Sequence, residues 1–125
     1  MAGSQAGLIE LDADPALHEA AGAALRAAGV TDGHLSIEFV DAARMQEVNR
    51  QHRGIDQPTD VLSFPVDGAG PTAGPRELGD VVICREYTAD VTEAAVHGVL
   101  HLCGYDHETD DGEMLELQDR VLAGL

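Results

Sequence analysis

The sequence has no lysine and no tryptophan, and its aromatic side chains are limited to two tyrosines and two phenylalanines. All seven basic residues are arginines, and they stand against 23 acidic residues, which gives a formal net charge of −16 at pH 7. So few cations exclude a protein that holds nucleic acid non-specifically through a broad basic surface. They do not exclude a small positive site formed by one arginine and a bound cation. Most of the acidity is typical of adaptation to solubility or to high salt.

Cysteines and long apolar runs are scarce as well. Cys84 and Cys103 both lie among apolar residues and form no C-x-x-C pair, so we expect small core residues rather than zinc ligands. The first residues do not resemble a signal peptide, and no apolar run approaches the roughly 18 residues that span a bilayer. We therefore expect a cytoplasmic protein with reduced thiols and no membrane partner.

Periodicity predicts the elements of one domain. Alternating apolar residues predict strands at 7–12 and 34–41, and near-continuous apolar runs predict strands buried on both faces at 61–66 and 80–84. Apolar residues at helical spacing predict helices over 16–29, 42–53, 91–103 and 110–125, with Asp14 and Asp41 near two of their starts. Mixed strands and helices indicate an α+β or α/β class with one sheet. Residues 1–6 are predicted to form a disordered tail, and residues 7–125 a single domain.

The stretch "HGVLHLCGYDH", residues 97–107, carries three histidines. His97 and His101 are four residues apart, so they project from one face of a helix about one turn apart. Gly104 can end that helix in a left-handed turn, which allows His107 to return toward the other two. Three neutral imidazoles with a fourth position left to water form an open zinc site of the catalytic type. The spacing therefore predicts a metal site rather than three unrelated surface histidines.

The other histidines lack such partners. His18 and His34 are expected to be structural or exposed. His52 is adjacent to Arg53 and could face the site, but we favour a position away from it.

The spacing H-x-x-x-H-x-x-G-x-x-H also matches the metzincin protease motif, in which glutamate follows the first histidine as the general base. Here that residue is Gly98, which cannot accept a proton, so a peptidase is disfavoured. Asp106 and Glu108 flank His107, and either could accept a ligand's free N–H or act as a base. An ordinary acidic loop is the simpler interpretation of both.

The same stretch resembles the signature H-G-x-L-H-L-x-G-Y-D-H of the YbeY family of rRNA-maturation endoribonucleases. Two further blocks, "NRQHRGIDQPTDVLSFP" at 49–65 and "GDVVIC" at 79–84, are similar to that family's other conserved segments, and the resemblance extends from about residue 8 to the C-terminus. It implies a single α+β domain with a mixed sheet of about four strands packed with helices. It also implies one Zn²⁺ per chain, held by His97, His101 and His107 in a zincin-like site.

The resemblance further implies cleavage of single-stranded RNA, with roles in 16S rRNA 3′-end maturation and ribosome quality control. Contacts with the ribosome or small-subunit proteins, and a monomeric state, belong to the same expectation. The family's functionally important arginine falls on Arg53, whose guanidinium suits bidentate binding of a phosphate and stabilisation of charge at phosphorus. An ion pair with Asp56 or Asp60 is the alternative role. Thr59, Asp60 and Ser63 are expected to shape the neighbouring loop and strand.

The sequence departs from the family's pattern at two places. His52 stands where the family has an aromatic residue, which alters a stacking or packing contact. The segment 85–96 is about a dozen residues shorter than in the family, so a truncated or missing helix and a changed substrate groove are expected. Two other functions stay open: a metal-dependent hydrolase of another substrate, including peptides, and a ribosome assembly factor with a structural zinc. An open fourth coordination position favours catalysis, and a closed one favours the structural role.

Overall fold

The computed structural model describes residues 9–67 and 76–125, so the predicted tail at 1–6 lies outside the described residues. The described strands are β1 (Ile9–Asp12), β2 (Gly33–Val40), β3 (Val61–Pro65) and β4 (Glu77–Cys84). The α-helices are α1 (His18–Ala27), α2 (Ala42–Arg53), α3 (Val91–Leu102) and α4 (Glu113–Ala123), and short 3₁₀ turns are η2 (Pro15–Leu17) and η3 (Arg85–Tyr87). This is the expected α+β fold. No helix in these residues is long and apolar enough to span a bilayer.

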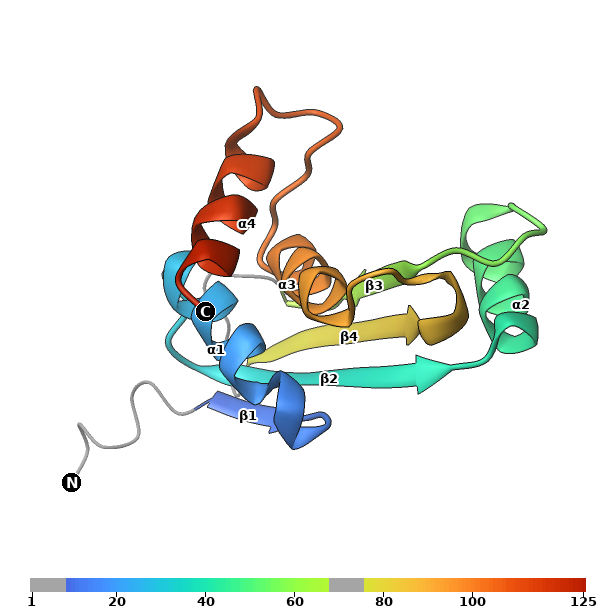
Figure 1. Cartoon of the computed structure of the whole chain (residues 1–125), viewed down its shortest axis with the longest axis horizontal. Helices are drawn as coiled ribbons and strands as arrows, with labels where there is room; N and C mark the ends of the chain where they lie inside the picture. Colours follow the sequence, from blue (N-terminus) through green and yellow to red (C-terminus); the bar gives the residue numbers. More distant parts are fainter. Residues whose placement is uncertain (1–8, 68–75) are drawn as a thin grey trace.

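The four strands form one mixed sheet in the order β1-β2-β4-β3 (Figure 1). β1 runs parallel to β2 and β2 runs parallel to β4, whereas β3 is antiparallel to β4 at the edge. α1 makes the crossover that a parallel β1–β2 pair requires.

The prediction that both apolar runs are buried on both faces is correct for β4 and wrong for β3. The last four residues of β4 are all buried, because this strand lies between β2 and β3. In β3 only Leu62 is fully buried, because the strand pairs on one side only and part of it lines an open pocket. An apolar run by itself does not distinguish a central strand from an edge strand.

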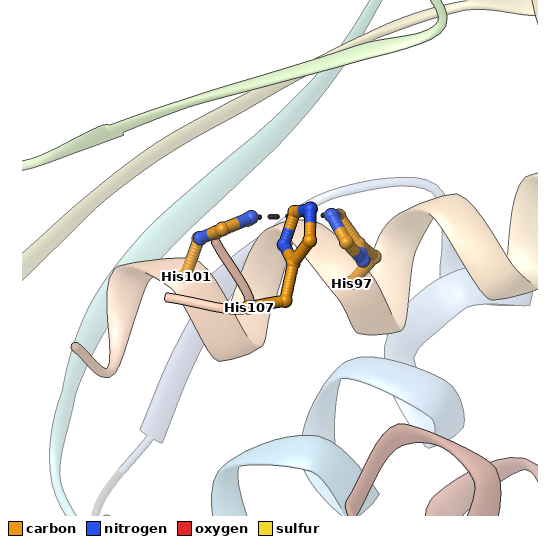
Figure 2. Close-up of side chains that lie close together, drawn as sticks. All are labelled: His97, His101 and His107. Carbon is orange, nitrogen blue, oxygen red and sulfur yellow. Dashed lines mark hydrogen bonds between the residues drawn. The ribbon is translucent and has the colours of Figure 1, made fainter. Parts of the chain in front are cut away.

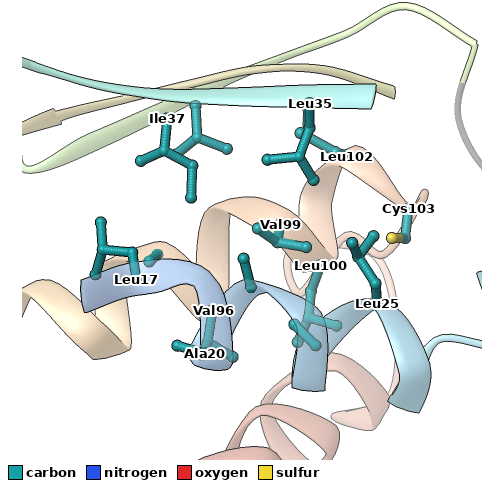
Figure 3. Packing of buried hydrophobic residues seen from close by; sticks show 14 of the residues in the cluster. Leu17, Ala20, Leu25, Leu35, Ile37, Val96, Val99, Leu100, Leu102 and Cys103 are labelled. Atoms are coloured by element: carbon teal, nitrogen blue, oxygen red, sulfur yellow. The ribbon is translucent and has the colours of Figure 1, made fainter. Parts of the chain in front are cut away.

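Helices cover both faces of the sheet. Val81 and Ile83 of β4 pack into the larger core, which includes residues of α1, α3 and α4. Figure 3 shows part of this core, where Val96 and Val99 of α3 lie between the sheet and α1. Val82 and Cys84, which alternate with them, pack against Met45 of α2 in a smaller core. Because successive side chains of a strand point to opposite faces, α2 lies across the sheet from the other three helices.

Both cysteines belong to these cores, as predicted. Cys84 and Cys103 are buried and carry no disulfide. Burial raises the pKa of the Cys103 thiol to about 11, against an opposing effect of the Arg76 guanidinium. Cys103 therefore remains a protonated, apolar side chain at neutral pH.

Capping residues fix where the two helices of functional interest begin. The Asp41 carboxylate accepts a hydrogen bond of 2.8 Å from the backbone N–H of Arg44 and starts α2. The Asp90 carboxylate accepts one of 3.1 Å from the N–H of Glu93 and starts α3. α2 ends at Arg53, where Gly54 takes a φ of +71° and its N–H donates to the carbonyl of Arg50. With its start fixed at Asp90, α3 presents its histidines in its second and third turns.

The connection from β4 to α3 is short, as the sequence indicates. It consists of η3 and three further residues, with no helix longer than one turn. Glu86 accepts a hydrogen bond of 3.1 Å from the backbone N–H of Ala42, and Thr88 donates one of 2.5 Å to the carbonyl of Cys84. The guanidinium of Arg85 lies 3.8 Å from the ring centroid of Phe39. The short connection is thus attached to the sheet and to the start of α2.

Candidate metal centre

The three histidines of the sequence motif converge at the end of α3 (Figure 2). His97 and His101 project from one face of α3, and His107 returns from the loop that follows. One ring nitrogen from each histidine lies within 4.8 Å of the others. The geometric expectation from the spacing is therefore confirmed: the described structure contains a three-histidine cluster that can hold a metal ion.

The turn after α3 brings His107 back. Gly104 has a φ of +100°, in the left-handed region that favours glycine. Its N–H donates to the carbonyl of His101 at 3.0 Å, and the N–H of Tyr105 donates to the carbonyl of Leu100 at 3.1 Å. These two bonds form a Schellman motif, which satisfies carbonyls at the helix end and reverses the chain direction.

Two of the three rings are oriented by protein acceptors. Nδ1 of His97 lies 2.8 Å from Oε1 of Gln118, and Nδ1 of His101 lies 2.9 Å from the backbone oxygen of Tyr105. Because both partners are carbonyl oxygens, each Nδ1 carries the proton and donates. The lone pair of each neutral ring is then on Nε2, the form that ligates a metal.

The two Nε2 atoms face one another at 3.1 Å. Two lone pairs at that distance repel unless a cation lies between them. A tetrahedral zinc with Zn–N bonds of 2.0–2.1 Å places ligand nitrogens about 3.3–3.4 Å apart, close to the observed spacing. Burial lowers the pKa of His101, and the neighbouring His97 lowers it further, which favours the neutral, ligating ring. The donor set therefore fits zinc.

The hydrogen bonding of His107 is a further observation that fits a ligand in the cluster. Its Nδ1 is buried and makes no hydrogen bond within the part of the chain that the structure describes. A buried polar atom without a partner costs free energy, and a bound ion or water is the usual way to satisfy one.

Asp106 and Glu108 are not the acceptors that orient the described ring N–H groups. The Asp106 carboxylate instead accepts a hydrogen bond of 3.0 Å from the backbone N–H of Glu108, and both side chains are exposed. The simpler interpretation, an ordinary acidic loop, describes these contacts. Gln118 was missed at the sequence level, although a signal exists: it is the polar residue between Met114 and Val121 on the buried stripe of α4.

Gly98 is explained by packing rather than chemistry. A Cβ on Gly98 would lie 2.5 Å from Cγ1 of Val81 in β4. The hydroxyl of Ser63 in β3 donates to the carbonyl of Gly98 at 3.0 Å, which fixes α3 against the sheet. Residue 98 therefore faces the sheet, and a glutamate side chain has no space there.

A pocket of about 970 Å³ opens beside the histidines. Its wall is formed by α3, the loop after it, β3 with the two residues before it, the short connection before α3, the end of α2, and Leu115 and Gln118 of α4. Arg53 is the one arginine among the lining residues. The carboxylates of the wall are Asp60, Asp90, Glu93, Asp106 and Glu108.

Arg53 is exposed in the last turn of α2 and makes no ion pair within residues 9–67 and 76–125. Asp56 accepts a hydrogen bond from Gln46, and Asp60 accepts one from the backbone N–H of Val61. The alternative in which Arg53 is an ion-pair partner of these residues is therefore not observed. The guanidinium is available to the pocket.

The remaining histidines lie away from the cluster, as expected. His18 contacts the carbonyl of Ala13 at 3.0 Å on the surface, and His34 pairs with Glu77 at 2.8 Å. The ring of His52 lies 4.7 Å from that of Phe64, centroid to centroid, and does not line the pocket.

Comparison with known proteins decides the family. Residues 10–125 match the family model described as "Endoribonuclease YbeY". This chain belongs to the YbeY family. It is 41% identical over 106 residues to an endoribonuclease YbeY of Persephonella marina, covering 73% of this chain and 69% of that protein. It is also 41% identical over 116 residues to one of Bacillus cytotoxicus, covering 75% and 74%.

The fold agrees with a solved structure. The solution structure of TM1509 from Thermotoga maritima matches this YbeY-family chain with a TM-score of 0.53 and 27% identity, over 92% of this chain and 87% of that chain. Family membership confirms the resemblance and supports an RNA-cleaving hydrolase.

The matches also bear on length. The 106-residue match to the Persephonella marina protein covers only 73% of a chain of 125 residues, so that relative carries residues that this chain lacks.

Proposed function

We propose that this YbeY-family chain is a zinc-dependent endoribonuclease specific for single-stranded RNA, acting in 16S rRNA 3′-end maturation and ribosome quality control. It would work in the cytoplasm as a monomer, in contact with the ribosome or small-subunit proteins. The observation that carries the metal dependence is the pair of Nε2 atoms that face each other at 3.1 Å while both Nδ1 atoms are bonded to carbonyl oxygens.

His97, His101 and His107 would hold one zinc ion. Bound there, zinc supplies Lewis-acid chemistry for a phosphate oxygen or for water. Among the described residues, no fourth histidine, cysteine or carboxylate joins the cluster, which supports the open, catalytic kind of site over the structural one.

Arg53 would bind the scissile phosphate. Its guanidinium can form two parallel hydrogen bonds to phosphate oxygens and stabilise charge that develops at phosphorus. The carboxylates of the pocket wall repel a polyanion, so an RNA strand would be held where Arg53, and a cation bound by the three histidines, neutralise its charge. The pocket volume of about 970 Å³ is sufficient for a nucleotide.

The peptidase alternative loses support from the packing of α3. Gly98 occupies the sequence position of the protease base, and it faces the sheet at Val81 rather than the pocket.

One experiment tests the proposal. Bound zinc is measured for wild type, His101→Ala and Arg53→Ala. Cleavage by the same three proteins is measured on a single-stranded RNA oligonucleotide and on the duplex form of that oligonucleotide. Arg50→Ala is the matched control, because Arg50 is exposed on the same helix and lies outside the pocket wall. We expect His101→Ala to lose both metal and cleavage, Arg53→Ala to keep metal and lose cleavage, and Arg50→Ala to retain both.

Chelation followed by addition of zinc should abolish and then restore cleavage. Undiminished cleavage by metal-free protein would overturn the metalloenzyme assignment. The cellular role is tested by replacing the wild-type gene with the His101→Ala form, which should lead to 16S rRNA with unprocessed 3′ ends.

A further inference from the structure

Gln118 has a buried side-chain amide among apolar neighbours. It lies in α4, 7% exposed, between Met114 and Val121, which belong to the larger core. Burying an amide costs free energy unless its hydrogen bonds are made. Its Oε1 lies 2.8 Å from Nδ1 of His97, 21 residues earlier in the chain. The bond to His97 therefore compensates for the burial of this side chain.

The direction of that bond determines which nitrogen of His97 is free. When the amide oxygen accepts, the His97 proton is on Nδ1 and the lone pair on Nε2 points at His101. If the amide nitrogen donated instead, Nδ1 would be the acceptor and the proton would lie on Nε2, between the rings. Only the first arrangement leaves Nε2 able to ligate a cation.

The two ligands of α3 depend on different kinds of acceptor. His101 is oriented by a backbone carbonyl, that of Tyr105, which is itself fixed by the helix end. His97 is oriented by a side chain from a different helix. The orientation of His97 is thus the part of the cluster that relies on the docking of α4 against α3.

We propose that Gln118 is a positioning residue that holds His97 as its Nδ1–H tautomer and fixes the ring direction. It acts through His97, which it holds by the hydrogen bond of 2.8 Å. α4 is thereby part of the metal centre. The effect on metal affinity rests on the proposed zinc site, whereas the effect on the tautomer does not.

The test compares Gln118→Met, which keeps the length of the side chain and removes the acceptor, with Gln118→Glu, which keeps an acceptor. Leu117→Met, on the same helix and packed against the core, is the matched control. The first readout is the pair of ¹⁵N chemical shifts of the His97 ring in metal-free protein at alkaline pH. The second is zinc affinity by competition with a chromophoric chelator.

We expect wild type, Leu117→Met and Gln118→Glu to show the Nδ1–H tautomer. Gln118→Met should show a mixture of tautomers and bind zinc about 10- to 100-fold more weakly, the usual effect of removing a partner that orients a ligand. A Gln118→Met protein that keeps the wild-type tautomer, or that changes tautomer without losing affinity, overturns the proposal. If wild type itself binds no zinc, the proposed function fails, and the ¹⁵N shifts still decide whether Gln118 selects the tautomer.

Discussion

The histidine end of the pocket, His97, His101 and His107, and its arginine end, Arg53, are built in opposite ways. His97 and His101 lie on a helix with mostly buried residues, and each ring is hydrogen-bonded in place. Arg53 extends from the exposed last turn of α2 and makes no ion pair within the described ranges. One end is ordered by the fold itself, and the other retains its conformational freedom until a ligand arrives.

Because of this difference, the two ends of the pocket should respond to different kinds of substitution. A preorganised ligand set loses little entropy on binding, so its performance depends on the packing that holds it. A free surface cation loses rotamer entropy when it binds, and its contribution is screened by salt. We therefore expect metal binding to respond to substitutions in the core, and substrate binding to respond to charge and ionic strength.

The largest effect should come from filling the space that Gly98 leaves. Gly98→Ala brings a Cβ within 2.5 Å of Cγ1 of Val81, so we expect a loss of about 1–3 kcal/mol in unfolding free energy, despite alanine's better helix propensity. Gly98→Glu should be worse, because it also buries a carboxylate. Urea denaturation measures the unfolding free energy of each variant, and a zinc titration measures its metal affinity.

A matched control and a rescue accompany this prediction. Gly124→Ala, at the end of α4, meets nothing closer than 3.6 Å and should be nearly neutral. Val81→Ala should partly relieve the Gly98→Ala variant, which gives a favourable coupling in a double-mutant cycle. An unaltered unfolding free energy for Gly98→Ala would show that α3 is not held against the sheet by this contact.

An intermediate effect is expected at the arginine end. Arg53→Lys keeps the charge and loses the planar fork, so RNA cleavage should fall about 10-fold or more while zinc affinity stays at the wild-type value. Added salt should weaken substrate binding and leave zinc binding nearly unchanged. A parallel loss of zinc would mean that the two ends are coupled and that the comparison fails.

The smallest effect concerns His34, which pairs with Glu77 between β2 and β4. The hydrogen bond to Glu77 raises the pKa of His34. Burial opposes this shift, and the negative charges of Glu77, Glu10 and Asp12 add to it. Because the folded pKa is raised, the stabilisation is fully present below the unfolded value of about 6.5 and is lost as pH rises through the folded pKa.

Both side chains of this pair are more than a third exposed, at 38% and 43%, so the effect should stay below about 1 kcal/mol. The difference in unfolding free energy between wild type and Glu77→Gln should shrink as the pH is raised above neutral. Zinc affinity should be the same in both proteins. A difference that grows with pH would contradict the assigned direction of the shift.

Sequence patterns predicted the structural features that are determined by residues close together in the chain. The four α-helices, the four strands and the convergence of His97, His101 and His107 follow from periodicity, caps and one glycine turn. The edge position of β3, the role of Gln118 and the reason for Gly98 were not predictable in the same way. Each depends on which distant element packs alongside, and the sequence does not say which residue, 21 or 35 positions away, completes the contact.

The Schellman turn at Tyr105 has one more consequence. The N–H of this residue closes the end of α3 on Leu100, and its carbonyl oxygen holds the ring of His101. The peptide unit before Tyr105 thus belongs to the helix end and the one after it to the metal centre, so fraying of α3 at this residue would release a ligand. Exchange of the Tyr105 amide hydrogen with solvent should therefore slow on addition of zinc, making this one backbone position a reporter of occupancy.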